Sequence, residues 1–245
     1  MKVVAIIQAR CGSTRFPNKV FAQICNHPLI WHVVNRLRFA NTIDEIVLAT
    51  TTNPIDDKLY EWAQENDVSV FRGSENDVLN RYYEAARFCN ADVVVRITAD
   101  DPFKEPQVID KAVRKLLDEG ADFVCNNFPP SYPEGLDVEV FTFKSLEIEE
   151  KNCISDYERE HVTQYFYHNP DNFKMFNISH TEDCSNLRWT IDTDTDFNMV
   201  LKVYADLYKD DDIFHMNEII EYLKKNPEVA AMNSEVARSA MYQSK

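Results

Sequence analysis

The sequence predicts an α/β protein of three layers, in which helices cover both faces of a mostly parallel sheet. From Met1 to Asn126, apolar runs of strand length alternate with segments whose apolar residues repeat at helical spacing. The first run, residues 3–7, is wholly apolar, as expected of a strand buried on both faces. This alternation favours right-handed crossovers, and ligands in such sheets bind beyond the carboxyl ends of the strands.

The individual elements follow from local pattern. The expected strands cover 3–7, 45–50, 68–71, 92–98 and 121–125. The expected helices cover 28–38, 54–66, 77–89 and 106–119. Pro28 suits a first helical turn, and Gly120 is the expected stop of the fourth helix.

The alternation breaks after Asn126, where Pro129, Pro130, Pro133 and Gly135 indicate a loop. Beyond it we expect strands at 137–141 and 174–178 and helices at 143–150 and 157–168. We interpret residues 1–245 as a single domain with an inserted lobe at about 127–180, ahead of a last short strand that ends at Asp192. A helix from about 195 to 208 and a short terminal helix after Pro227 complete the expected order.

Composition excludes several classes of partner. Lys and Arg number 26 against 41 Asp and Glu, a net charge of −15 that argues against general binding to nucleic acid or to acidic membranes. No apolar run approaches membrane-spanning length, and the N-terminus enters a strand directly without a signal peptide. The six cysteines form no CxxC pair, so reduced thiols in a cytoplasmic protein are expected.

A basic, small-residue loop follows the first strand. Gly12, Ser13 and Thr14 allow close approach of backbone N–H groups to an anion, and Arg10, Arg15 and Lys19 supply positive charge. The sequence of the loop matches neither the Walker pattern nor GxGxxG. It predicts a triphosphate-binding loop, and the alternative is a solvated surface loop.

Two acidic clusters lie at expected strand ends. Asp100 and Asp101 follow the fourth strand, and Asp192 follows the last. One carboxylate from each of two strand ends, together with substrate phosphates, is a usual way to hold Mg²⁺. The alternative is that these residues cap the helices that follow them.

Six ordered motifs resemble a known family. They are Gln8-Ala9-Arg10-x-Gly12-Ser13-Thr14-Arg15-x-Pro17-x-Lys19, Arg72-Gly73-Ser74-x-x-Asp77-Val78-Leu79-x-Arg81-Tyr82, Ala99-Asp100-x-Pro102, Tyr132-Pro133-x-Gly135-Leu136-Asp137-Val138-Glu139-Val140-Phe141, Arg159-Glu160-His161-Val162-Thr163 and Arg188-Trp189-Thr190-x-Asp192-Thr193. Over nearly its whole length the chain resembles the CTP-dependent sugar cytidylyltransferases, specifically the SpsF-like branch, which is related to acylneuraminate and KDO cytidylyltransferases. Asn18 stands where that family often has Gly, and Asp194-Thr195 replaces a frequent Pro-Glu.

The resemblance implies a Rossmann-like, GT-A-like nucleotidyltransferase fold, with CTP, Mg²⁺ and a small anionic acceptor as ligands and a homodimer as assembly. It implies that Arg10, Arg15 and Lys19 are catalytic and that Asp100 and Asp192 bind the metal. The implied nucleotide-binding residues are Gln8, Ala9, Gly12, Ser13, Arg72, Gly73, Ser74, Asp77 and Arg81. The implied acceptor-binding residues are Glu134, Asp137, Glu139, Arg159 and His161, although a surface salt-bridge face would also explain Arg159, Glu160 and His161.

The reaction implied is transfer of CMP from CTP to an acceptor oxygen, with release of pyrophosphate, in surface polysaccharide or glycan biosynthesis. A 2-keto-3-deoxy sugar acid is the expected acceptor, and a phosphorylated acceptor is chemically possible. The rivals are a metal-dependent glycosyltransferase that would use Asp100 and Asp101, and a non-catalytic nucleotide-binding protein.

Overall fold

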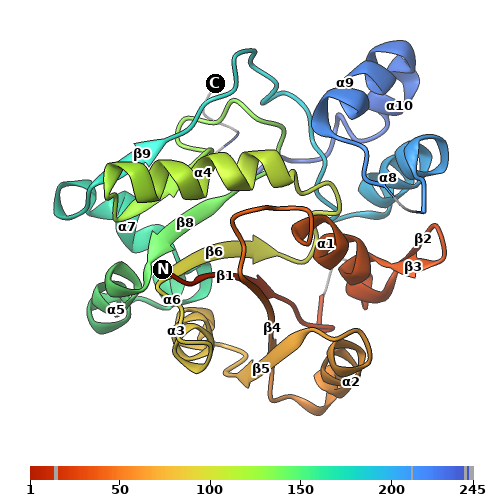
Figure 1. Cartoon of the computed structure of the whole chain (residues 1–245). Coiled ribbons are helices and arrows are strands. Elements are labelled where there is room, and N and C mark those ends of the chain that lie inside the picture. Colours follow the sequence, from red (N-terminus) through yellow and green to blue (C-terminus); the bar gives the residue numbers. More distant parts are fainter. Residues whose placement is uncertain (14–15, 211, 240–241, 243–245) are drawn as a thin grey trace.

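A single mixed sheet forms the centre of the molecule. The structure, a computed structural model, describes residues 1–13, 16–210, 212–239 and 242. Within this part of the chain the sheet has seven strands in the order β5-β4-β1-β6-β8-β7-β9 (Figure 1). Their bounds are β1 Val3–Gln8, β4 Glu45–Thr51, β5 Ser69–Gly73, β6 Val93–Thr98, β7 Phe123–Cys125, β8 Glu139–Thr142 and β9 Met175–Asn177. All seven strands expected between residues 3 and 178 are thereby confirmed to within a few residues.

The direction of the strands divides the sheet in two. β5, β4, β1 and β6 pair in parallel, whereas β8 runs antiparallel between β6 and β7. β9 then pairs with β7 in parallel. The expected mostly parallel sheet is confirmed, and the segment 127–180 contributes two of its strands, β8 and β9, to the same sheet.

Helices cover both faces of this sheet (Figure 1). The helices are α1 Leu29–Leu37, α2 Asp57–Glu65, α3 Val78–Phe88, α4 Pro106–Glu119, α5 Phe143–Asn152, α6 Asp156–His161, α7 Gln164–His168, α8 Asp194–Leu207, α9 Met216–Lys225 and α10 Pro227–Ala231. Side chains alternate along β1: Ala5 and Ile7 pack in the core beneath α1 and α4, and Val4 and Ile6 pack in the core beneath α3. Three layers therefore form, as the strand–helix alternation predicts.

The expected helix over 157–168 is wrong. Val162 adopts φ 62° and ψ −67° and ends α6, and α7 begins at Gln164. The interruption buries the Val162 side chain completely and lets Thr163 donate a hydrogen bond of 2.9 Å to Glu139 Oε1. Tertiary packing of these two side chains thus outweighs helix continuity, which a local apolar pattern cannot reveal.

The expected short strand before Asp192 is also wrong. Arg188 makes only an isolated bridge with Glu134, and no strand includes residues 188–191. α8 starts at Asp194, capped by Thr193 in a reciprocal capping box with Asp196. Asp192 therefore lies at the end of an irregular segment, one residue before this cap.

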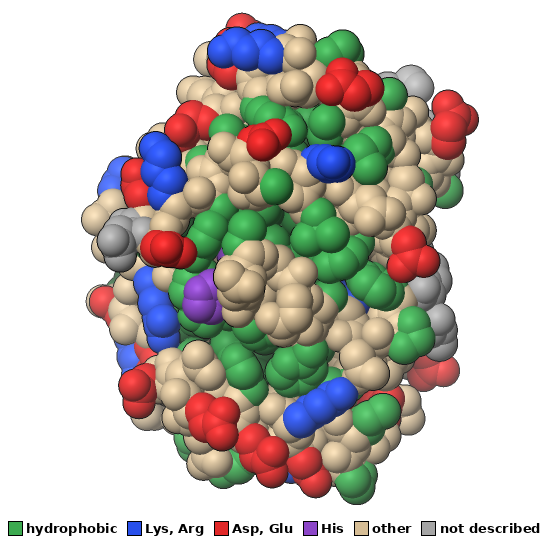
Figure 2. Space-filling view, turned by 90° about the vertical axis from the view of Figure 1, so that its right-hand side faces the viewer, with side chains coloured by type: hydrophobic (Ala, Val, Ile, Leu, Met, Phe, Trp, Pro, Cys, Tyr) green, Lys and Arg blue, Asp and Glu red, His purple; other side chains and the backbone are tan. Residues whose placement is uncertain are grey.

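One face of the molecule is formed by α1, α8 and the two-stranded hairpin β2 (Gln23–Ile24) and β3 (His27–Pro28). Figure 2 shows hydrophobic side chains gathered in the middle of this face, with charged side chains above and below them. Trp31 stacks on His27 with ring centroids 3.8 Å apart, which fixes the hairpin against α1. No helix in the described part of the chain is long and apolar enough to span a membrane.

Candidate active site

Two adjoining cavities open at the carboxyl ends of β1 and β6. The first chamber, of about 780 Å³, is lined by the loop after β1, by the start of α3 and by α6. The second chamber, of about 340 Å³, extends toward β8 and the C-terminal residues. They share five lining residues: Arg96, Thr98, Asp100, His161 and Asp192. Two ligands bound in the two chambers would therefore meet at these residues.

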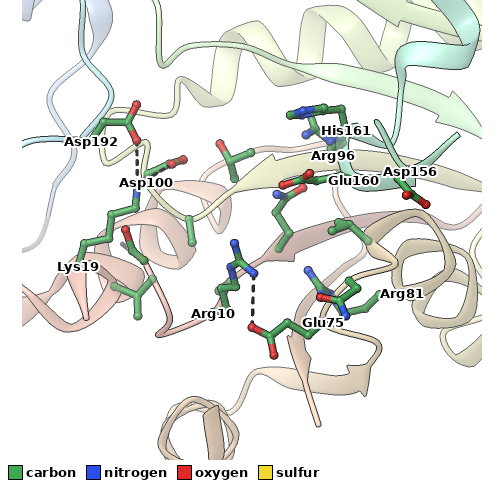
Figure 3. A pocket seen from close by; sticks show the side chains of 18 residues that line it. Arg10, Lys19, Glu75, Arg81, Arg96, Asp100, Asp156, Glu160, His161 and Asp192 are labelled. Carbon is green, nitrogen blue, oxygen red and sulfur yellow. Dashed lines mark hydrogen bonds and ion pairs between the residues drawn. The ribbon is translucent and has the colours of Figure 1, made fainter. Parts of the chain in front are cut away.

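Lys19 joins the two expected metal carboxylates at this junction (Figure 3). Its Nζ lies 2.9 Å from Asp100 Oδ2, 3.2 Å from Asp192 Oδ1 and 2.8 Å from the main-chain oxygen of Ile191. Burial alone would lower the pKa of Lys19, but the two carboxylates outweigh it and raise that pKa above 10.5. Burial would likewise raise the pKa of Asp100, but Lys19 lowers it below 3.8. Lys19 and Asp100 are therefore both charged at neutral pH.

The oxygen atoms around the Lys19 ammonium also fit a divalent cation. The oxygens of two carboxylates and one main-chain carbonyl converge on a single position, which the ammonium group of Lys19 occupies. The described residues contain no cluster of three or more His, Cys, Asp or Glu side chains that could hold a metal ion. One or two carboxylates completed by substrate phosphates are characteristic of Mg²⁺ rather than of a fully protein-bound metal.

Neither carboxylate of this pair caps a helix. α4 begins at Pro106 with Glu105 as its N-cap, and Thr193 caps α8. Asp101 differs from Asp100, because its buried carboxylate lies 2.8 Å from Lys104 Nζ and accepts a hydrogen bond of 2.6 Å from Thr98. The structure thus brings Asp100 together with Asp192 and commits Asp101 to Lys104.

The basic loop after β1 forms the floor of the first chamber. Arg10 is exposed there and lies 3.4 Å from Glu75 Oε1, while Arg15 falls outside the described residues. Asn18 adopts φ 56°, a left-handed conformation that glycine favours and asparagine tolerates. Its main-chain N donates to the oxygen of Cys11, whose own N–H donates to the buried Asp56. Burial raises the pKa of the Cys11 thiol to about 12, so this cysteine is a poor nucleophile.

The residues expected to bind nucleotide divide into two groups. Gln8, Ala9, Ser13 and Arg81 line the first chamber, and Gln8 Oε1 and Arg81 Nε are buried without a hydrogen-bond partner in the described part of the chain. Gly12, Arg72, Gly73, Ser74 and Asp77 do not line it.

Within this second group, Arg72 donates to the main-chain oxygens of Thr51 and Asn53. Other members of the group hold Arg81 or α3 in place. The oxygen of Ser74 accepts from Arg81, and a side chain at Gly73 would come within 3.0 Å of Arg81.

The residues expected to bind acceptor lie mostly in the second chamber. Glu134, Asp137, Glu139 and His161 line it, whereas Arg159 does not. Glu139 is buried and ion-paired to Arg96 at 2.6 Å. Arg159 instead binds Asp77, the N-cap of α3, at 2.8 Å and Glu150 of α5 at 2.9 Å. The salt-bridge alternative thus describes Arg159, while Glu160 and His161 face the first chamber (Figure 3).

A buried ionic cluster supports the junction from behind. The guanidinium of Arg188 lies 3.0 Å from Glu134, 3.1 Å from Asp192 and 2.9 Å from Asp196. Gly135 packs so tightly beside it that a side chain there would come within 2.7 Å of the main-chain N of Thr190. Glu134, expected to contact the acceptor, is therefore engaged with Arg188 and also with Arg238.

Sequence reasoning missed Arg96, Glu75 and Tyr242 as chamber residues. Arg96 carried a usable signal, because it is a charge within an otherwise apolar strand. Its Nε is buried without a partner among the described residues. Tyr242 carried no such signal, because it lies in a polar terminal segment far from every motif.

Comparison with known proteins places this site in context. A family model described as cytidylyltransferase matches residues 4–232. The chain is 40% identical over 244 residues to the uncharacterized protein MJ1063 of Methanocaldococcus jannaschii, with 98% of each chain covered. It is 30% identical to the spore coat polysaccharide biosynthesis protein SpsF of Bacillus subtilis, covering 93% of this chain and 96% of SpsF.

Solved structures agree with this similarity. A cytidylyltransferase from Leptospira borgpetersenii superposes with a TM-score of 0.90 at 37% identity, covering 94% of this chain and 97% of the other. The structure of CMP:2-keto-3-deoxy-manno-octonic acid synthetase complexed with CTP superposes with a TM-score of 0.64 at 18% identity, covering 84% of this chain and 99% of the other. The latter likeness establishes a shared nucleotidyltransferase fold.

Proposed function

The chain belongs to the cytidylyltransferase family, and from that premise we propose that it transfers CMP from CTP to a 2-keto-3-deoxy sugar acid in surface polysaccharide or glycan biosynthesis. The observation that carries the proposal is the convergence of Asp100 and Asp192 on one cation position where two chambers meet. Such a position suits the α-phosphate of a nucleotide bound on one side and an attacking oxygen bound on the other. The names of SpsF and of the synthetase complexed with CTP support the pathway and the acceptor class.

In this reaction the protein aligns the two substrates and stabilises negative charge, and it forms no covalent bond to either of them. The acceptor oxygen attacks the α-phosphorus of CTP, the bond from that phosphorus to the bridging oxygen breaks, and pyrophosphate leaves. Arg10, Arg15 and Lys19 neutralise the departing pyrophosphate. Mg²⁺ held by Asp100, Asp192 and the phosphates would polarise the α-phosphate. Lys19 then turns from the carboxylates toward the phosphates, a movement that its flexible stem allows.

The acceptor assignment is supported by Arg96. This residue lines both chambers and keeps a buried Nε free of hydrogen bonds within the described part of the chain. A sugar-acid carboxylate could accept from that N–H beside the reacting atoms. We also propose that the segment 127–180 forms the acceptor lobe and a homodimer contact, which light scattering of the purified protein would test.

The alternatives are less well supported by the same contacts. A glycosyltransferase that used Asp100 and Asp101 together would have to break the Lys104–Asp101 ion pair, in which both side chains are at most 5% exposed. A phosphorylated acceptor would bring further negative charge into a second chamber that already contains six carboxylates.

The test measures nucleotide choice and turnover. With Mg²⁺ present, CTP should raise the melting temperature far more than ATP or GTP, and pyrophosphate should form only when a sugar acid is added.

Lys19→Met should reduce turnover by about 100-fold or more, because it removes a transition-state cation. Lys58→Met is the matched control, since Lys58 is exposed, lines neither chamber, and contacts Asn18 and the ring of Phe21. Equal melting shifts for the three nucleotides, or an active Lys19→Met protein, would refute the proposal.

A further inference from the structure

Residues 233–239 and Tyr242 lie beside the second chamber, which Ser239 and Tyr242 help to line. We define the strap as residues 233–239 together with Tyr242. Arg238 anchors it: its Nε lies 2.5 Å from Glu134 Oε2, and its terminal nitrogens donate to the main-chain oxygens of Ser185, Asn186 and Leu187 at 2.6–3.0 Å. The main-chain N of Ser239 also donates to Glu134, at 3.0 Å. The family model ends at residue 232, so the whole strap lies beyond the part of the chain that defines the family.

The strap contributes two residues, Ser239 and Tyr242, to the lining of the second chamber. The hydroxyl of Tyr242 donates a hydrogen bond of 2.8 Å to Asp137 Oδ1. The other carboxylate oxygen of Asp137 accepts from the main-chain N of Gly135 at 3.1 Å. Tyr242 is half-buried and forms part of the chamber wall.

Asp137 differs from the other acidic residues of the second chamber. The other five carboxylates each have a basic partner: Asp100 and Asp192 pair with Lys19, Asp101 with Lys104, Glu134 with Arg188 and Glu139 with Arg96. Asp137 makes no ion pair with any residue that the structure describes. A carboxylate has about four lone-pair positions, and among the described residues two donors, Gly135 and Tyr242, use two of those on Asp137. It therefore keeps capacity to accept hydrogen bonds from a ligand.

We propose that the strap completes the acceptor site and that Tyr242 and Asp137 form a specificity-determining pair for hydroxyl groups of the acceptor. This inference rests on the proposed function and sharpens it. Because the single proton of the Tyr242 hydroxyl is donated to Asp137, its oxygen can accept from one sugar hydroxyl, and Asp137 can accept from a second one. A phosphate at the same end of the acceptor would lie against an unpaired carboxylate, and like charges repel. The pair thus selects a hydroxylated end of the sugar over a phosphorylated one.

The experiment removes one hydroxyl. In Tyr242→Phe, the KM for 3-deoxy-manno-octulosonate should rise about threefold to tenfold, the size expected for a lost hydrogen bond between two neutral hydroxyl groups, with kcat within about threefold of wild type. The KM for CTP and the melting shift with CTP should not change, because Tyr242 does not line the first chamber. The matched control is Tyr222→Phe, which removes a tyrosine hydroxyl 2.7 Å from Asp206, away from both chambers. A phosphorylated analogue of the sugar should be a poor acceptor for the wild-type protein, and Asp137→Asn should improve it.

Several results would overturn the assignment. Tyr242→Phe with a wild-type KM for the acceptor would remove Tyr242 from the site, and an equal loss of CTP affinity would mean that it acts only through general structure. Docking of the strap is tested without any acceptor, since trypsin should cut slowly after Arg238 in the wild-type protein and faster in Glu134→Gln. Rapid cleavage after Arg238 in the wild-type protein would by itself refute the docking of the strap. Absence of turnover in the wild-type protein with every sugar acid would instead refute the proposed function, and it would be seen before any strap variant is made.

Discussion

Two ionic clusters share Asp192 and differ in almost every other respect. The open cluster, Lys19 with Asp100 and Asp192, lines the first chamber, its two carboxylates also line the second, and its side chains are 13–27% exposed. In the buried cluster, Arg188 with Glu134 and Asp196, only Glu134 lines either chamber, and the side chains are at most 5% exposed. Both combine one cation with carboxylates, so composition alone does not distinguish a reactive cluster from a structural one.

The choice of cation explains the difference. The ammonium of Lys19 is a single point charge on a flexible stem, and substrate phosphates can attract it away from its carboxylates. The guanidinium of Arg188 is a rigid fork that donates from Nε and NH2 to the two oxygens of Asp196 at 2.9 and 3.2 Å. Burial would lower the pKa of Arg188, but Asp196 and Glu134 outweigh it and raise that pKa. The buried cluster is therefore fixed, whereas the open cluster can exchange its cation.

The largest expected effect is on stability and comes from the buried cluster. Arg188→Ala leaves Glu134 and Asp196 buried without their shared cation, which costs about 3–5 kcal/mol of unfolding free energy. Urea unfolding measures this loss. Arg87→Ala is the control, because its ion pair with Glu84 is exposed and should contribute less than about 1 kcal/mol. Similar losses in the two variants would show that the buried cluster contributes no more to stability than an exposed ion pair.

The next effect is on activity and comes from the open cluster. Asp100→Asn and Asp192→Asn should each reduce turnover about 100-fold or more and raise the Mg²⁺ concentration needed, because each removes a charge that attracts the metal. Asp192→Asn should also lower stability more than Asp100→Asn, since Asp192 additionally pairs with Arg188. Turnover is measured against Mg²⁺ concentration, with the exposed Asp194→Asn as control. Unchanged Mg²⁺ curves for both variants would exclude the paired-carboxylate site.

The smallest effect concerns pH. The folded-state pKa of Asp100 is depressed, so its ion pair contributes stability above about pH 4, its unfolded pKa, and loses that contribution as pH falls through the folded value. The pKa of Lys19 is raised, so its contribution is complete below about pH 10 and is lost only above that. The free energy of unfolding of the wild-type protein should therefore exceed that of Lys19→Met by about 1–2 kcal/mol from pH 5 to 9. This difference should shrink below about pH 4. A difference that grew on acidification, measured by urea unfolding across this range, would contradict the open ion pair.

The structure also corrects the expected role of Lys19 in the metal-free protein. The sequence predicts that Lys19 binds phosphate, and without a cation between them Asp100 and Asp192 would repel each other. Instead Lys19 lies between the two carboxylates and compensates them. Removing one carboxylate therefore relieves little repulsion, and Asp100→Asn should not stabilise the protein.

The sequence by itself determined the layered fold and the side of the sheet on which the site lies. Apolar runs such as Val3–Gln8 and helical periodicity such as that of Pro106–Glu119 depend on local burial, and local burial leaves a periodic pattern in the chain. The residues that follow β1 and β6 must then meet at one edge of a parallel sheet. Lys19 and Asp100 could therefore be assigned to one site before their contact was known.

Only the tertiary structure decided which charged residues face the chambers. Asp100 and Asp101 are neighbours in sequence, but one binds Lys19 at the junction and the other binds Lys104 in the interior. Arg72 and Arg81 belong to one motif, but only Arg81 lines the first chamber. Tyr242 reaches Asp137 across 105 residues of sequence. The direction of a side chain depends on packing between elements that are distant in the chain, and a local pattern carries no record of that packing.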